Sequence, residues 1–116
     1  MGRSYEDLLV WQRSVEFSVE IYSVTAHFPK YELYGMTSQL RRAAVSVPSN
    51  IAEGQARRTR ADFKHFLSIA RGSLMEIETQ LLIASRLGYL PQDNFLSLRT
   101  RSSEIGRLIN GLMNSL

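Results

Sequence analysis

Apolar residues recur along most of the chain at steps of three and four, the spacing of a buried helical face. The first segment with this pattern covers residues 5–28 and carries two apolar sets where one is usual. The first set is Leu8, Trp11, Val15, Val19, Tyr22 and Ala26. The second set is Val10, Phe17, Ile21, Val24 and Phe28. At roughly 100° per residue, the two sets lie on nearly opposite sides of one helix.

Two opposed apolar faces on a single helix must each be packed against other protein to be shielded from water. A surface helix of a monomer needs only one apolar face, so we expect one set to pack inside the protomer and the other against a second subunit. Phe17 and Ile21 are the residues that we assign to such structural or subunit contacts. The alternative is a central helix that its own chain covers on both sides.

The second helical segment covers residues 36–54 and contains a proline. Pro48 lacks a backbone N–H, and its ring crowds the carbonyl group of Ala44. The sequence therefore predicts a helix that is kinked at Pro48, with Ser46 or Ser49 hydrogen-bonding to the freed groups. A break into two helices is the alternative. Asn50 and Glu53 are best interpreted as partners of backbone groups at the kink and at the helix end.

Two further segments repeat a heptad pattern. Thr59 and Asp62 have the spacing of a capping box at the start of the third helix, which ends near Leu87 and Gly88. Its seam is Phe63, Leu67, Ala70, Leu74, Ile77, Leu81 and Ala84. The fourth helix starts near Pro91, and its seam is Phe95, Leu98, Ser102, Ile105, Ile109, Leu112 and Leu116. The pattern predicts an all-α, up-down-up-down four-helix bundle in a single domain, residues 1–116.

The amino-acid composition excludes several kinds of functional site. The chain has no cysteine, which excludes disulfides and thiolate metal sites, and His27 and His65 have no partner at metal-ligand spacing. We therefore expect no metal and no cofactor. No run of residues reads as a signal peptide or approaches the length of a membrane span, so we expect a cytoplasmic protein without membrane contact.

Charge is unevenly distributed along the chain. Residues 1–35 hold three basic and five acidic residues, a net charge of −2. Residues 36–72 hold seven basic and two acidic residues, a net charge of +5, and residues 73–116 hold four of each. Twelve of the fourteen basic residues are arginines, whose forked guanidinium suits phosphate and carboxylate groups. The middle of the chain is thus the place to look for an anionic partner.

Several long motifs resemble a known family. They are LVWQ at 9–12, FP at 28–29, LRRAAVSVPSNIAEG at 40–54, FLSIARGS at 66–73 and EIETQL at 76–81. With them, most of the chain resembles the four-helix-bundle proteins encoded in intervening sequences of bacterial 23S rRNA genes. It is more distantly similar to the accessory variability proteins of diversity-generating retroelements. The resemblance implies a four-helix protomer in a ring-like homopentamer. The retroelement relatives are basic pentamers that act with nucleic acid and reverse transcriptase, whereas the rRNA-associated branch has no settled biochemical function.

The basic residues allow three interpretations: phosphate binding, structural pairing and a merely solvated face. For the first, the candidates are Arg57, Arg58, Arg60 and Lys64, which surround a helix start where free amides favour anions. For the second, the candidates are Arg41, Arg42 and Arg71, with Glu53, Glu76 or Glu78 as acidic partners that hold helices or subunits together. We favour phosphate contact for the first group and a structural role for the second.

Catalysis has little support in the sequence. His65 and Ser68 are neighbours on a helix, but no carboxylate is placed to orient the histidine. Glu76 and Glu78 are two residues apart on a helix and point away from each other. Phe63 and Phe66 have the spacing of core residues, and Tyr31 and Tyr34 allow either loop packing or a contact. We therefore expect no catalytic residues and no enzyme activity.

These observations favour a non-catalytic homo-oligomer that engages RNA or other nucleic acid, DNA included, through arginines. The alternative is a protein-interaction scaffold, with structural arginines and an acidic partner protein. A steep fall of affinity with salt distinguishes the first from the second.

Overall fold

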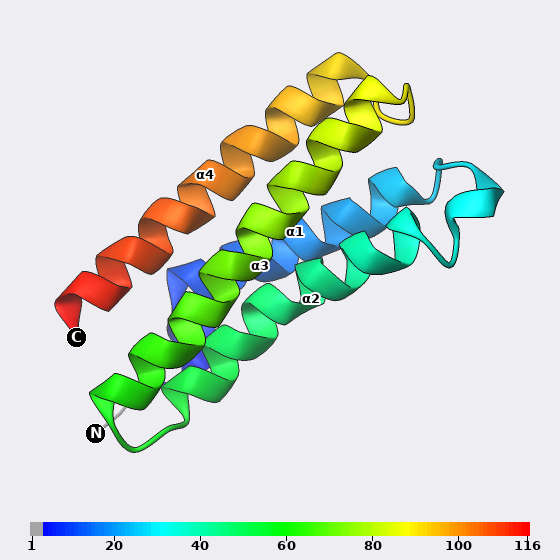
Figure 1. The fold of residues 1–116 in the computed structure, drawn as a ribbon. Coiled ribbons are helices and arrows are strands. Elements are labelled where there is room, and N and C mark those ends of the chain that lie inside the picture. Colours follow the sequence, from blue (N-terminus) through cyan, green and yellow to red (C-terminus); the bar gives the residue numbers. More distant parts are fainter. Residues whose placement is uncertain (1–3) are drawn as a thin grey trace.

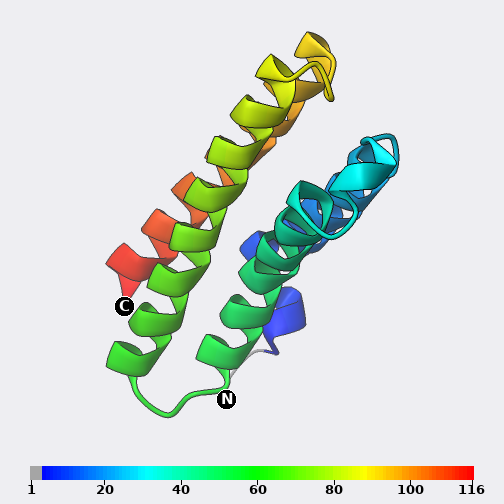
Figure 2. The same ribbon diagram turned by 45° about the vertical axis from the view of Figure 1, so that its right-hand side comes forward.

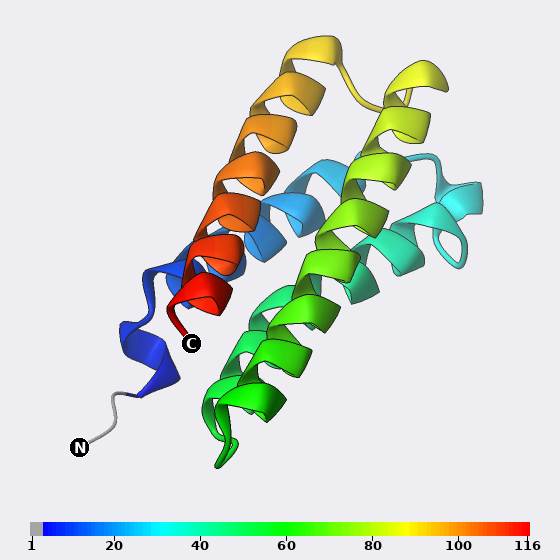
Figure 3. The same ribbon diagram turned by 60° about the vertical axis from the view of Figure 1, so that its left-hand side comes forward.

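The computed structural model describes residues 4–116, and it confirms the all-α bundle. Four helices, α1 (Leu9–Thr25), α2 (Met36–Gln55), α3 (Arg60–Arg86) and α4 (Gln92–Ser115), run alternately up and down (Figure 1). Two short 3₁₀ turns, η1 (Tyr5–Asp7) and η2 (Lys30–Glu32), precede α1 and α2. Each helix packs against the next, and α1 also packs against α4, which closes the bundle (Figure 3).

The first helix is shorter than the apolar pattern predicts. Leu8 has an extended backbone, with φ −76° and ψ 124°, so the helix begins only at Leu9. The ring of Tyr5 packs edge-on against Trp11, with centroids 5.2 Å apart, which holds η1 beside the start of α1. At the other end, the amide of Phe28 donates to the carbonyl of Thr25 in a tighter turn, and the helix stops before Pro29.

The structure shows which apolar face of α1 points inward. Phe17 and Ile21 are 1% and 0% exposed within a single protomer. The prediction that they contact a second subunit is therefore wrong, because no neighbouring chain can reach them; their role is in the core. Of the opposite set, Val19 and Tyr22 face outward and are 64% and 45% exposed, whereas Leu8 and Trp11 pack against the core.

Helix α2 continues through Pro48 without interruption, so it does not break into two helices. Figure 1 shows α2 changing direction along its length. The carbonyl of Ala44, which has lost its helical donor to Pro48, lies 2.8 Å from the hydroxyl oxygen of Ser18 on α1. That hydroxyl also lies 2.9 Å from the carbonyl of Ser14, so one proton serves two acceptors. The predicted local donors are wrong, because a neighbouring helix supplies the hydrogen bond.

Asn50 does act on the backbone near the proline, as predicted. Its side-chain amide donates to the carbonyl and the hydroxyl oxygen of Ser46, at 2.8 and 2.9 Å. The Ser46 hydroxyl in turn lies 3.0 Å from that of Ser73 on α3. This chain of contacts links the bent part of α2 to α3.

The turn between α2 and α3 requires a close approach of the two helices. A Cβ atom at Gly54 would lie 2.7 Å from the Cβ of Phe66 and 3.0 Å from the Cδ1 of Phe63. Thr59 caps α3 as predicted, because its hydroxyl accepts from the amide of Asp62 at 3.1 Å. Only a glycine fits at position 54 without movement of the neighbouring helix.

The loops between α1 and α2 and between α3 and α4 lie at the same end of the bundle (Figures 1 and 2). Gly88 follows the C-terminal end of α3 and has φ +81°, the left-handed conformation that favours glycine after a helix. Tyr89 follows it, and the Tyr89 hydroxyl donates to the Glu32 carboxylate at 3.0 Å. The Tyr31 hydroxyl lies 3.2 Å from the Tyr89 hydroxyl. These hydrogen bonds and burial raise the pKa of Tyr89 above its usual value of 10.0; the contact with Tyr31 contributes most. The cluster ties the two loops together.

Candidate nucleic-acid interface

The turn between α2 and α3 places basic side chains together at one end of the molecule. Its exposed cations are Arg57, Arg58, Arg60 and Lys64. Among the described side chains, none of these four forms an ion pair with an acid. They lie at the end of the bundle opposite the two loops that Tyr89 connects (Figure 1). The predicted phosphate-binding residues are therefore grouped and free to contact an anion.

Two local features orient this cluster. The guanidinium of Arg57 lies over the ring of Phe66, 4.7 Å from its centroid, and this cation–π contact attaches the arginine to α3. The first turn of α3 directs its unpaired amides toward the same end of the molecule. Asp62 also lies in that first turn and offsets part of the positive potential. The net effect is a cationic end with one acid in it.

Arg41 has a structural role, but not with the acids that we predicted. Its Nε donates to the hydroxyl of Thr25 at 2.9 Å, and its Nη2 donates to the carbonyl of Tyr22 at 3.3 Å. The guanidinium also lies 4.7 Å from the centre of the Tyr22 ring. A cation here donates hydrogen bonds to acceptors in the last turn of α1 and interacts favourably with the dipole of that helix. The prediction of a Glu53, Glu76 or Glu78 partner is wrong for this residue.

The other predicted structural pairs are also absent among the described residues. Arg71 donates to the side-chain oxygen of Asn110 on α4 at 2.9 Å. Glu76 accepts from Gln80, and Glu78 accepts from Ser102 at 2.7 Å. Arg42 and Glu53 are exposed, and no ion pair to either is found within residues 4–116. Arg71 and Glu78 thus connect helices through neutral partners.

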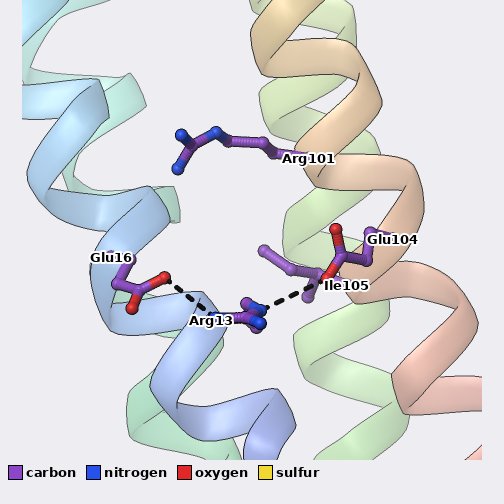
Figure 4. Close-up of a pocket in the computed structure, with 5 residues that line it drawn as sticks. All are labelled: Arg13, Glu16, Arg101, Glu104 and Ile105. Carbon is purple, nitrogen blue, oxygen red and sulfur yellow. Dashed lines mark hydrogen bonds and ion pairs between the residues drawn. The ribbon is translucent and has the colours of Figure 1, made fainter.

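A charged cleft between α1 and α4 was missed at the sequence level. Figure 4 shows Arg13 and Arg101 reaching across it from opposite helices. Arg13 pairs with Glu104 at 3.3 Å and with Glu16 at 3.5 Å, and Arg101 pairs with Glu20. The cleft holds about 290 Å³, with Ile105 in its lining. The available signal was the charged residues Arg13, Glu16 and Glu20, which lie between the two apolar sets of the first helix, together with Arg101 on the fourth helix.

An apolar groove lies on the outer side of α1 and α2. It is lined by Val15, Ser18, Val19, Tyr22, Val45 and Pro48, and it holds about 420 Å³. A second cavity continues from it through Tyr22 and Val45 to Tyr34 and Arg42 in the loop region. Tyr34 is 94% exposed and Tyr31 is 78% exposed. The outward apolar face of the first helix is therefore one wall of a groove.

The remaining candidates lie apart from these surfaces. His65 is exposed, and its ring contacts Phe66 edge-on at 5.8 Å between centroids. Within residues 4–116, no three His, Asp or Glu side chains are placed to hold a metal ion. None of the described helices combines the length and apolar character that crossing a bilayer needs.

Comparison with known proteins identifies the family. The family model of the 23S rRNA-intervening sequence protein matches residues 6–111. The chain belongs to this family. A crystal structure of a protein of unknown function from the S23 ribosomal protein family of Bacteroides thetaiotaomicron is 29% identical, with a TM-score of 0.82. The alignment covers 90% of this chain and 98% of that one. No curated protein matches the chain. The predicted family resemblance is confirmed.

Proposed function

We propose that this 23S rRNA-intervening sequence protein is a non-catalytic homo-oligomer that binds RNA, or other nucleic acid, through the cationic end. The observation that carries the proposal is the group of four exposed, unpaired cations at the start of α3: Arg57, Arg58, Arg60 and Lys64. Phosphate contacts of this kind supply affinity without reading a base sequence.

The arrangement suits phosphate better than it suits a protein carboxylate. Arg57 and Arg58 come from the turn, and Arg60 and Lys64 come from the start of α3. Three of the four cations are arginines, which bind phosphate oxygens bidentately. Arg57 is already in contact with the Phe66 ring, so less side-chain entropy is lost on binding. A duplex or a folded RNA presents phosphates at regular intervals, which a cluster of this size can follow.

Assembly of the protein into a ring of five copies, as the family resemblance implies, would multiply a weak contact. One cluster makes few phosphate contacts, but linked copies bind with an effective concentration that raises the overall affinity. The outward groove of α1 and α2 offers the exposed apolar surface that assembly requires. Oligomerisation and nucleic-acid binding are therefore parts of one proposal.

The test is binding of a structured ribosomal RNA fragment, and of an unrelated RNA of equal length, over a range of salt. The mass of the protein is first measured by light scattering. A variant with Arg57, Arg58 and Arg60 changed to Ala is expected to keep its assembly and to lose roughly 2–3 units of the log–log salt slope for each copy that contacts the RNA. The matched control changes Arg86, Arg99 and Arg107, which are exposed arginines elsewhere, to Ala. Its affinity should stay close to that of the unchanged protein. No binding to either RNA at low salt would overturn the proposal.

A protein-interaction scaffold is the second candidate, and the loop end favours it. Tyr34, Tyr31 and Leu33 are 94%, 78% and 49% exposed in the loop beside Arg42. Tyrosine and arginine are the residues that most often dominate protein interfaces. Under this alternative, RNA affinity is negligible at physiological salt, and changing Tyr34 to Ala abolishes capture of an acidic partner protein.

A further inference from the structure

Two exposed apolar surfaces of the protomer differ in shape. The first is the groove of α1 and α2, which is concave and is lined by Val19, Tyr22 and Val45 among others. The second, which we call the α3 ridge, lies along the outward side of a helix. It consists of Ile69, Gly72, Glu76, Ile83 and Leu87, all exposed and spaced so that they share one side of the helix. Neither surface is covered within the protomer.

The groove has the properties of a receptor for a helix. Its lining is almost entirely apolar: two valines of α1, a tyrosine ring, and Val45 and Pro48 of α2. Val19 and Val45 are 64% and 43% exposed, so a partner would remove a large part of both from water. A groove between two helices accepts the apolar side of a third helix in the same way that helices pack in a core.

The α3 ridge has the properties of the matching helix. Ile69, Ile83 and Leu87 are 40%, 44% and 54% exposed. Gly72 lies between the first two, and a Cβ built there would meet no atom within 4 Å. A glycine on an outward helical face lets a second backbone approach closely, without a side chain to hold it away.

Charge supports the same pairing. Arg42 borders the groove and has no ion pair among the described residues. Glu76 is exposed in the middle of the ridge and accepts one hydrogen bond, from Gln80, so it has lone pairs left for a cation. An arginine beside the groove and a glutamate on the ridge make the two surfaces electrostatically complementary.

From these observations we infer that the α3 ridge of one copy packs into the α1–α2 groove of the next copy. The inference rests on the homo-oligomer of the proposed function and identifies its contact surfaces. Because the two surfaces are different, the contact is heterologous, and each added copy leaves one groove and one ridge open until the assembly closes. A two-fold dimer, in which groove meets groove, is the competing arrangement.

Chemical cross-linking tests the inference directly, because the chain has no cysteine. A Val45→Cys chain is co-expressed with a Gly72→Cys chain that carries a size tag, and the mixture is treated with a short bis-maleimide. Each chain has one reactive group, so every product joins two copies. The control replaces the second variant with Ser97→Cys, an exposed position on α4. Light scattering verifies that each variant keeps the mass of the unchanged protein.

The expected result is a mixed cross-linked pair for positions 45 and 72, formed in about tenfold or greater excess over the control pair. The Val45→Cys chain alone should give almost no dimer. Dimers from that chain alone would show that groove meets groove and would overturn the inference. Equal yields for positions 72 and 97 would also overturn it, while leaving the oligomer of the proposed function intact. A monomeric mass for the unchanged protein would reject both together.

Discussion

The bundle is closed by two seams that are built in opposite ways. Between α2 and α3, Gly54 packs against the side chains of Phe63 and Phe66, and Ser46 meets Ser73 at 3.0 Å. Between α1 and α4, half-exposed charges face one another across a cleft of about 290 Å³. The first seam depends on the size of its side chains, because tightly packed surfaces cannot absorb added atoms. The second depends on charge and tolerates changes of shape.

The difference between the two seams follows from how the chain connects the helices. Helices joined by a short turn are held close by the chain itself, so their contact can be tight and selective. The first and last helices are brought together only by tertiary packing, and ion pairs there add orientation more than stability. We expect mutations to separate the two seams clearly.

The largest effect is expected at Gly54. Changing Gly54 to Ala places a carbon 2.7 Å from the Cβ of Phe66, which is too close for either helix to stay in place. We expect a loss of about 1–3 kcal/mol in the free energy of unfolding, measured with urea. The control, Gly106→Ala, has no atom within 4 Å of the new Cβ and should gain about 0.5–1 kcal/mol. A Gly54→Ala protein as stable as the control would contradict the close contact.

A smaller effect is expected at the seam between α3 and α4. Ser102 is fully buried and donates to the Glu78 carboxylate at 2.7 Å. Changing Ser102 to Ala leaves that half-buried carboxylate without its donor and should cost about 1–2 kcal/mol in the free energy of unfolding. Ser97→Ala, at an exposed position of the same helix, is the comparison and should be nearly neutral. Equal stabilities for the two variants would show that the hydrogen bond from Ser102 to Glu78 does not stabilise the protein.

The charged seam should respond least. Replacing Arg13 with Met and Glu104 with Leu removes an ion pair whose side chains are 45% and 46% exposed. We expect a change within about 1 kcal/mol, because exposed pairs contribute little and apolar replacements pack at least as well. The measurement is urea unfolding at low and high salt. A loss comparable to that at Gly54 would show that the two seams do not differ as we describe.

The loop cluster adds a pH-dependent tie between the two helical hairpins. The folded protein holds the Tyr89 proton more tightly than the unfolded chain, so the unfolded chain releases it first as the pH rises past 10.0. The stability from this group is complete below that pH and is lost as the pH rises toward the folded pKa. A Tyr89→Phe variant should therefore show a flatter alkaline decline in thermal midpoint. Parallel declines for both proteins would contradict the assignment.

Much of this architecture is predictable from local sequence. The helical segments follow from apolar spacing, and Thr59 and Gly88 act where turn and cap chemistry places them. The basic cluster is also visible, because its residues are close in the sequence. Such features depend on neighbours within one or two turns of helix.

The features that could not be predicted depend on how the helices rotate and which helices meet. The sequence presents two apolar faces on the first helix, and only packing shows that Phe17 and Ile21 point inward. Arg41 donates to a carbonyl at the end of α1 instead of pairing with a carboxylate, because the packing of α1 against α2 brings that carbonyl within hydrogen-bond distance. Arg13 meets Glu104 far along the chain, a contact that no local pattern encodes.

The hydrogen bond from Ser18 to the carbonyl that Pro48 leaves unpaired also constrains how this protein can evolve. Replacing Pro48 with an ordinary helix former would return an amide donor to Ala44 and make the serine unnecessary there. Replacing Ser18 alone would leave a buried carbonyl without a partner. Across homologous sequences, we expect these two distant positions to change together, with serine retained wherever the proline is kept.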